Sequence, residues 1–216
     1  MKKETLYRGG FYLAGILSLA FGITLSTRAG LGISPITSFA YALAEGLNTS
    51  LGRMVLVQYS LMLIVEFLLD GKEHRKWRNL LQLPFSLVFS SFLDAFGALI
   101  RIECTAMWQQ WALLGTALIF ISTGASMMVA MQLVPNPADA LYMSMARFFR
   151  KDPGLMKNAL DLICLLCALT FDLTLSGGLV SVGLGTVAAM ILTGRFVYLF
   201  NRLFRQRILR LAGLSD

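Results

Sequence analysis

Six long apolar stretches dominate the sequence and limit what it can fold into. They cover residues 10–27, 53–69, 80–100, 111–131, 155–175 and 179–200. A helix that crosses a bilayer needs about 20 mostly apolar residues, with a range of about 17 to 25, and each stretch falls within that range. Because backbone N–H and C=O groups find no water inside a bilayer, only helices and closed barrels cross it. The stretches lack the alternating pattern of barrel strands, so the sequence predicts an all-α membrane protein with six transmembrane helices.

The overall composition agrees with this class. Hydrophobic residues make up 56% of the chain and charged residues only 14%, whereas soluble domains average about 25% charged residues. We expect residues 1–216 to form a single membrane domain whose main partner is the lipid bilayer. The net charge of +7 is explained by loops that face anionic lipid head groups, and no nucleic-acid-binding module is present.

The second half of the sequence repeats the first at an offset of 102 residues. Eight residues are identical over the 49 aligned positions 22–70 and 124–172, and in both copies a Pro-containing break separates two apolar stretches. The identical pairs include Pro35 with Pro137 and Asp70 with Asp172. Internal repeats of this kind in an apolar chain are typical of transporter folds. We therefore predict a first repeat over residues 9–100 and a second over residues 111–202.

Each repeat contains a short segment that begins with a helix-start signature. Ser34 and Asn136 are favourable N-cap residues, and the following Pro suits the first helical turn. Thr37 and Asp139 stand at the third helical position, where a polar side chain reaches back as in a capping box. The segments 35–47 and 137–149 are too short to cross a bilayer. They are predicted to be re-entrant or broken helices, and capped helices at the membrane interface are the alternative.

Positive charges predict the orientation of the chain. They concentrate near the N-terminus, at 72–78, at 147–157 and near the C-terminus, and only Arg28, Arg53 and Arg101 of the nineteen lie on the opposite side. Since Lys and Arg accumulate on cytoplasmic loops, both termini are predicted to be cytoplasmic in a multi-pass protein of the bacterial inner membrane. Each repeat contributes three spans, which is an odd number, so the two repeats are predicted to be inverted relative to each other.

Polar residues at membrane depth are the candidates for a functional role, because burying them in lipid is costly. Asp94 and Asp161 lie within predicted spans, and Asp139 follows the second break. Pairing of Asp161 with Lys157 one turn away is an equally good structural explanation. The full set of residues predicted to line a substrate or ion pathway is Ser34, Thr37, Asp94, Asn136, Asp139, Asp161, Gly185 and Thr186. We expect both helix starts to approach each other near the middle of the bilayer and to share one polar cavity with Thr186 and Asp94.

Other chemistry has little support in the sequence. No nucleophile and base occur in a recognisable arrangement, so no catalytic residue is assigned and the chain is not predicted to be an enzyme. Cys164 and Cys167 lie in an apolar helix without further ligands and are interpreted as packing residues. No metal site and no cofactor are predicted.

Three segments carry a family resemblance. Residues 28–35 (RAGLGISP) resemble the R-A-G-L-G-x-S-P segment of the YczE/YyaS/YitT-like bacterial membrane proteins, a largely uncharacterised family. Residues 175–186 are similar to its G-G-x-x-G-x-G-T segment, with Ser181 in place of a glycine, and residues 136–139 to its G-P-x-D segment, with Asn136 in place of the glycine. The resemblance implies a small bacterial inner-membrane protein and supplies no catalytic residue or cofactor.

Two functions fit these features. The first is a small secondary transporter or permease, with a polar site for a small polar or ionic substrate at the repeat interface. The alternative is a non-transporting accessory, assembly or regulatory membrane protein, because a fold does not imply a function. The sequence names neither a substrate nor an oligomeric state.

Overall fold

The computed structural model describes residues 2–70 and 77–214, and within them it contains helices and no strand. In chain order the elements are α1 (Lys2–Ala29), α2 (Pro35–Gly46), α3 (Leu51–Leu69), the 3-10 helix η1 (Trp77–Leu81), α5 (Gln82–Leu99), α6 (Met107–Met131), α7 (Pro137–Phe149), α8 (Pro153–Phe171), the π-helix η2 (Asp172–Ser176) and α9 (Leu184–Leu211). Among the described residues, six helices are long and apolar enough to cross a membrane: α1, α3, α5 with part of η1, α6, α8 with η2, and α9. The prediction of an all-α chain with six candidate spans is confirmed. The charged residues Lys72, Arg75 and Lys76 lie outside the described residues.

The elements of the two halves correspond at the offset found in the sequence. The helices α2 and α7 begin at Pro35 and Pro137, and α3 and α8 begin at Leu51 and Pro153. Several boundaries differ from the prediction: α1 begins at Lys2 and not at residue 10, α6 begins at Met107 and not at residue 111, and α9 ends at Leu211 and not at residue 200. The last span begins at Leu184 and not at residue 179, because a turn with Gly177 at a φ of +68° and a non-helical segment precede it.

Both predicted short helices are present, and their starts are capped differently. The Asn136 side chain accepts a hydrogen bond of 3.0 Å from the backbone N–H of Ala138. Ser34 makes no such bond to the backbone, and its hydroxyl instead lies 3.1 Å from the hydroxyl of Thr37. In both helices Pro follows the N-cap, where its fixed φ favours the first turn.

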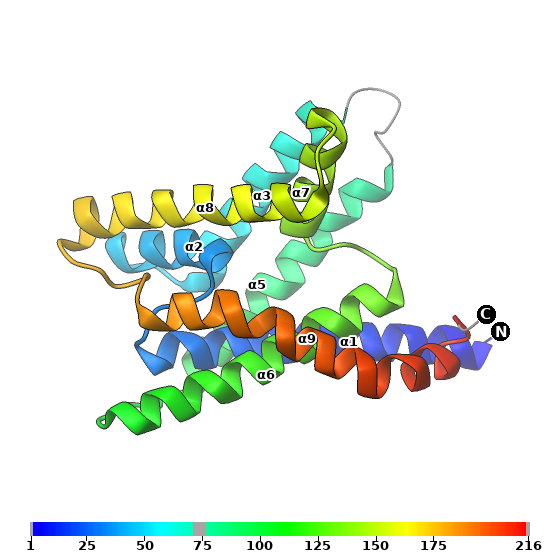
Figure 1. Ribbon diagram of the computed structural model, residues 1–216, viewed down its shortest axis with the longest axis horizontal. Coiled ribbons are helices and arrows are strands. Elements are labelled where there is room, and N and C mark those ends of the chain that lie inside the picture. Colours follow the sequence, from blue (N-terminus) through cyan, green and yellow to red (C-terminus); the bar gives the residue numbers. More distant parts are fainter. Residues whose placement is uncertain (1, 71–76, 215–216) are drawn as a thin grey trace.

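Figure 1 shows α1, α6 and α9 side by side in one part of the molecule, with α2, α3, α7 and α8 gathered in the other. The helix α5 packs on both α1 and α3 and so joins the two parts. Small residues let α1 and α6 approach closely: a Cβ atom on Gly22 would lie 2.7 Å from the backbone N of Ile121. Close approach through glycine is a common way for membrane helices to associate.

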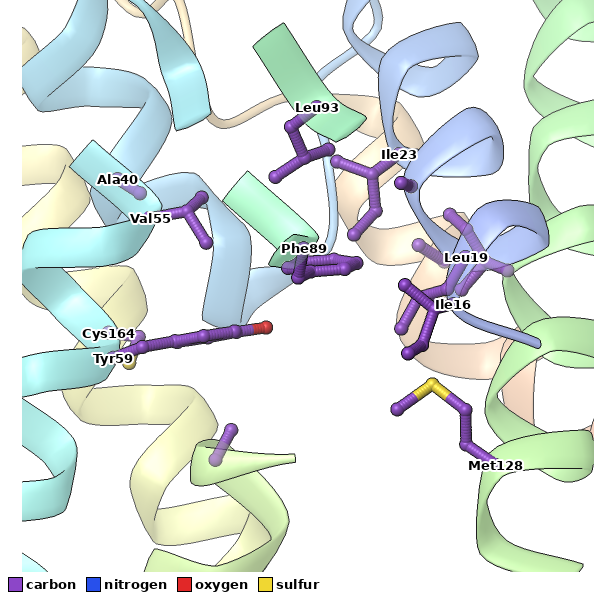
Figure 2. Packing of buried hydrophobic residues seen from close by; sticks show 14 of the residues in the cluster. Ile16, Leu19, Ile23, Ala40, Val55, Tyr59, Phe89, Leu93, Met128 and Cys164 are labelled. Carbon is purple, nitrogen blue, oxygen red and sulfur yellow. The ribbon is translucent and has the colours of Figure 1, made fainter. Parts of the chain in front are cut away.

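The buried core lies where the two parts meet. The rings of Tyr59 and Phe89 stack with centroids 5.8 Å apart. Figure 2 shows Phe89 between Val55 on one side and Ile16 and Leu19 on the other, with the Tyr59 side chain below Val55. Many large apolar side chains on α8 and α9 are exposed instead, which suits helices that face lipid hydrocarbon.

Candidate functional site

A cavity of about 540 Å³ lies between the two halves of the chain. One wall is apolar and comes mainly from α1 and α6, with Leu19, Ala125, Met128 and Val129. The other wall is polar and comes from α3, η1 and α7. Its polar residues are Glu66, Asp70, Asn79, Asn136, Asp139 and Arg147. The segment that joins α6 to α7 completes the lining with Gln132, Leu133, Val134 and Pro135.

Glu66 is the most deeply buried acidic residue of this wall, with only 2% of its surface exposed. Two side-chain amides hold its carboxylate: Asn79 donates to Oε1 at 2.8 Å and Gln82 donates to Oε2 at 2.9 Å. These donors stabilise a charge that would otherwise be costly at this depth. They also attach the start of α5 to the end of α3.

Asp70 follows one turn after Glu66 and forms an ion pair with Arg147, which also lines the cavity. Its Oδ1 lies 2.8 Å from a guanidinium nitrogen of Arg147 on α7. The same nitrogen donates to the hydroxyl of Ser144 at 2.6 Å. The side chain of Arg147 is 46% exposed, so water screens this pair and lowers its value for stability.

The start of α7 faces the cavity. The Asn136 side chain donates to the Tyr59 hydroxyl at 3.1 Å, and Asp139 lines the cavity one turn later. The neighbouring charges on α8 belong to Asp161 and Lys157, which pair with each other at 2.7 Å. The structural pairing considered for Asp161 is therefore observed.

The starts of α2 and α7 meet the middle of α3 at consecutive residues. Gln58 donates to the backbone carbonyl of Ile36 at 2.7 Å, and Tyr59 receives the hydrogen bond from Asn136. The first turns of both short helices therefore lie against the centre of one long apolar helix.

The other predicted site residues lie away from this cavity. Asp94 accepts hydrogen bonds from the Ser50 hydroxyl at 3.0 Å and the Gly52 N–H at 2.8 Å, and so it caps the start of α3. Thr186 accepts a hydrogen bond of 3.2 Å from the N–H of Gly183. Of the predicted set, Asn136 and Asp139 line the cavity, while Ser34, Thr37, Asp94, Asp161, Gly185 and Thr186 do not.

Sequence reasoning did not assign Glu66, Asn79 or Arg147 to the site. The available signal was the position of Glu66 inside an apolar span, one turn before Asp70. Carboxylates one turn apart share a helix face, and that face indicates which side of α3 avoids lipid. The partners Asn79 and Arg147 come from distant segments and have no local signature.

Comparison with known proteins agrees with the resemblance seen in the sequence. The chain is 27% identical over 195 residues to the uncharacterized membrane protein YczE of Bacillus subtilis (strain 168), a match that covers 90% of this chain and 85% of the relative. It is 21% identical over 201 residues to the uncharacterized protein YyaS of the same organism, covering 92% and 94%. No solved structure matches the chain. A family model matches residues 6–202, and the chain therefore belongs to the family of unknown function DUF6198.

Proposed function

We propose that this membrane protein is a small secondary transporter of the bacterial inner membrane, and not an enzyme, with its solute site in the cavity between two inverted halves. The observation that carries the proposal is the lining of the cavity. Both halves contribute to it, and carboxylates and the first turn of a short helix face it. Transporters with inverted repeats bind solutes at the repeat interface, beside discontinuous helices.

The packing of α1 against α6 supports the inverted arrangement. Ser18 and Phe120 occupy equivalent positions, and the Ser18 hydroxyl donates to the Phe120 carbonyl at 2.8 Å. A residue that contacts its own equivalent lies near a two-fold axis. On either side, Gly22 contacts Ala117 and Gly15 contacts Gly124, which is one contact repeated with the halves exchanged. The contacts run from Gly15 to Gly22 along α1 and from Gly124 back to Ala117 along α6, so the two helices are antiparallel. A two-fold axis that exchanges antiparallel helices is perpendicular to both. For helices that cross the membrane, such an axis lies in the membrane plane.

The short helices support the same relation. The helix α2 packs on α8, and its equivalent α7 packs on α3, which is the equivalent of α8. Each short helix therefore contacts a long helix of the opposite half. Exchanging the halves exchanges these two contacts, as expected for a two-fold relation.

The charges of the cavity favour a small cation or zwitterion as the solute. Glu66, Asp70 and Asp139 face it, and Arg147 is the basic residue of its described lining. The start of α7 adds a partial positive charge and suits an anionic group. A solute with an ammonium group finds carboxylates on the polar wall, and a carboxylate on the same solute is accommodated by Arg147 or the start of α7.

The orientation of the protein in the membrane is testable with reporter fusions. Because the charge pattern assigns both termini to the cytoplasm, fusions at Gly71 and Asp216 are expected to report a cytoplasmic location. A fusion at Glu103 is expected to report the periplasm. Periplasmic signal from either of the first two fusions would contradict the inverted, six-span topology. Positions 71 and 216 lie outside the described residues, so the test depends on topology alone.

The proposed solute site is tested by thermal stability of the purified protein. The panel contains alkali ions, quaternary ammonium ions, amino acids and small carboxylates. We expect a cationic or zwitterionic member to raise the unfolding temperature, since a solute at about 100 times its Kd stabilises by about 2.7 kcal/mol. Asp139→Asn should fold and lose this response. Asp152→Asn, at the exposed N-cap of α8, should keep it.

A second measurement separates transport from the accessory role. Ala140 lines the cavity, and a single cysteine at this position should react with a charged thiol reagent if the cavity contains water. Stabilisation by no member of the panel, together with an unreactive Ala140→Cys variant, would indicate a dry scaffold and contradict the proposal.

A further inference from the structure

Two segments outside the cavity lining, residues 31–33 before α2 and residues 181–185 at the start of α9, contact each other. The N–H of Ile33 donates to the carbonyl of Ser181 at 3.1 Å, and the N–H of Gly185 donates to the carbonyl of Leu31 at 2.6 Å. We call the contact between residues 31–33 and 181–185 the seam. It joins the segment before α2, in the first half, to the segment before α9, in the second half.

Glycine makes this close contact possible. Gly32 has a φ of +88°, and a Cβ atom on it would overlap the backbone N of Gly183 and lie 2.6 Å from the Thr186 hydroxyl oxygen. A Cβ atom on Gly185 would lie 2.7 Å from the carbonyl oxygen of Leu31. The backbones therefore touch directly, and no side chain lies between them at these positions.

Asp172 fixes one of the two segments. Its Oδ2 accepts hydrogen bonds from the N–H of Val180 at 3.1 Å, and from the N–H and hydroxyl of Ser181 at 2.9 Å each. Asp172 and Ser181 are both fully buried. The end of α8 therefore holds Ser181 in the position where it accepts the bond from Ile33.

The equivalent segments at the other end both contribute to the lining of the cavity. By the 102-residue offset, residues 31–33 correspond to 133–135, and residues 181–185 correspond to 79–83. Asn79, Leu133, Val134 and Pro135 all line the cavity. Pro135, the equivalent of Ile33, has no N–H to donate, and residues 79–83 are helical where 181–183 are not. Among the described residues, no backbone hydrogen bond joins 133–135 to 79–83.

We propose that the seam is a gate on the solute path, so that a solute leaving the cavity toward this end of the molecule passes between residues 31–33 and 181–185. The inference rests on the proposed function and adds the barrier and the residues that hold it shut. The two halves separate at the seam by breaking two backbone hydrogen bonds. The adjoining first turn of α2, with the buried Thr37, then meets water.

Cysteine labelling tests the gate without any solute. Thr37→Cys is introduced into a chain in which the three native cysteines are replaced by alanine. A membrane-impermeant thiol reagent is then added to intact cells. With the seam intact, labelling should be slow. Gly32→Ala and, separately, Gly185→Ala should raise the labelling rate roughly tenfold, since each forces the two backbones apart. Gly115→Ala, whose Cβ atom would meet nothing within 4 Å, should leave the rate unchanged.

The outcomes distinguish the gate from the transporter. If Gly32→Ala does not accumulate in the membrane, Gly185→Ala carries the test, because Gly185 is helical and its φ allows a side chain. Unchanged labelling in a variant that accumulates and unfolds at the wild-type temperature would overturn the gate. Faster labelling in a protein that no solute stabilises would keep the seam as the barrier and remove the proposed solute site.

Discussion

Replacing Gly22 with alanine is expected to lower the free energy of unfolding by about 2 kcal/mol, because the added methyl group forces α1 and α6 apart. The Cβ atom would lie 2.7 Å from the N of Ile121 and 2.8 Å from the carbonyl oxygen of Ala117. Both are backbone atoms of α6 and have no freedom to rotate away. A titration with SDS, which unfolds membrane helices, measures the change.

Gly115→Ala is the matched control on α6 itself. Its Cβ atom would meet nothing within 4 Å, and alanine favours a helix over glycine by about 1 kcal/mol. We therefore expect this variant to be slightly more stable than the wild type. Both substitutions replace glycine with alanine in a helix, so helix propensity changes equally in both. A loss of stability in Gly22→Ala together with a gain in Gly115→Ala would therefore be due to the contact between α1 and α6.

The proposed two-fold relation adds a second test. Gly124 is the equivalent of Gly22, and a Cβ atom on it would lie 2.5 Å from the N of Leu19 on α1. Gly124→Ala should therefore cost about as much as Gly22→Ala. The double variant should cost less than the sum, since helices already moved apart by one methyl group accommodate the next one more easily. Two strictly additive losses would argue against a single shared contact.

The sequence predicted local features of the fold better than it predicted the cavity. Six apolar stretches predicted the candidate spans, and the residue pairs Ser34–Pro35 and Asn136–Pro137 predicted where the short helices begin. Both rest on rules that act within a few residues: the length of a span and the chemistry of a helix start. Of the eight residues predicted to line a substrate or ion pathway, Asn136 and Asp139 line the cavity, and their role in a pathway stays a prediction.

Contacts between distant segments were not predictable in the same way. The bond between Tyr59 and Asn136, and the pairing of Asp70 with Arg147, each join residues 77 positions apart. The seam was also missed, although its glycines were visible in the sequence. A glycine-rich segment indicates a turn or a close approach, but the sequence does not say which backbone approaches it. Asp94 was predicted to line the pathway because it is a carboxylate within an apolar stretch. In the structure it caps the start of α3, a contact with a distant segment that the sequence does not reveal.

Asp172→Ala is expected to reduce the free energy of unfolding by about 3 kcal/mol. The change removes the acceptor of two backbone N–H groups and one hydroxyl, in a place where Asp172 is fully buried. A buried donor without an acceptor costs about 1 to 3 kcal/mol. Within the described part of the chain, Oδ1 of Asp172 has no hydrogen-bond partner. Removing this buried, unpaired oxygen is favourable and offsets part of the lost stability.

Two aspartates serve as controls for this variant. Asp152 also accepts bonds from two backbone N–H groups, but at the exposed start of α8, where loss of an N-cap costs about 1 kcal/mol. Asp70 is the equivalent of Asp172 in the first half, and its partner Arg147 is nearly half exposed, so Asp70→Ala should cost less than Asp172→Ala. SDS titration of all three variants ranks their losses in the free energy of unfolding, and we expect the largest loss for Asp172→Ala.

The position of Asp172 adds a consequence that stability alone does not measure. Because its carboxylate holds Ser181, and Ser181 accepts the hydrogen bond of Ile33, Asp172→Ala should also loosen the seam. Labelling of Thr37→Cys from the outside should then rise, while the same change at Asp152 or Asp70 should leave it slow. If Asp172→Ala loses stability but labelling stays slow, Asp172 only stabilises the end of α8 and does not act on the seam. If labelling rises in Asp172→Ala and in neither control, Asp172 positions the gate. Its equivalent Asp70 lines the cavity instead and has no such role.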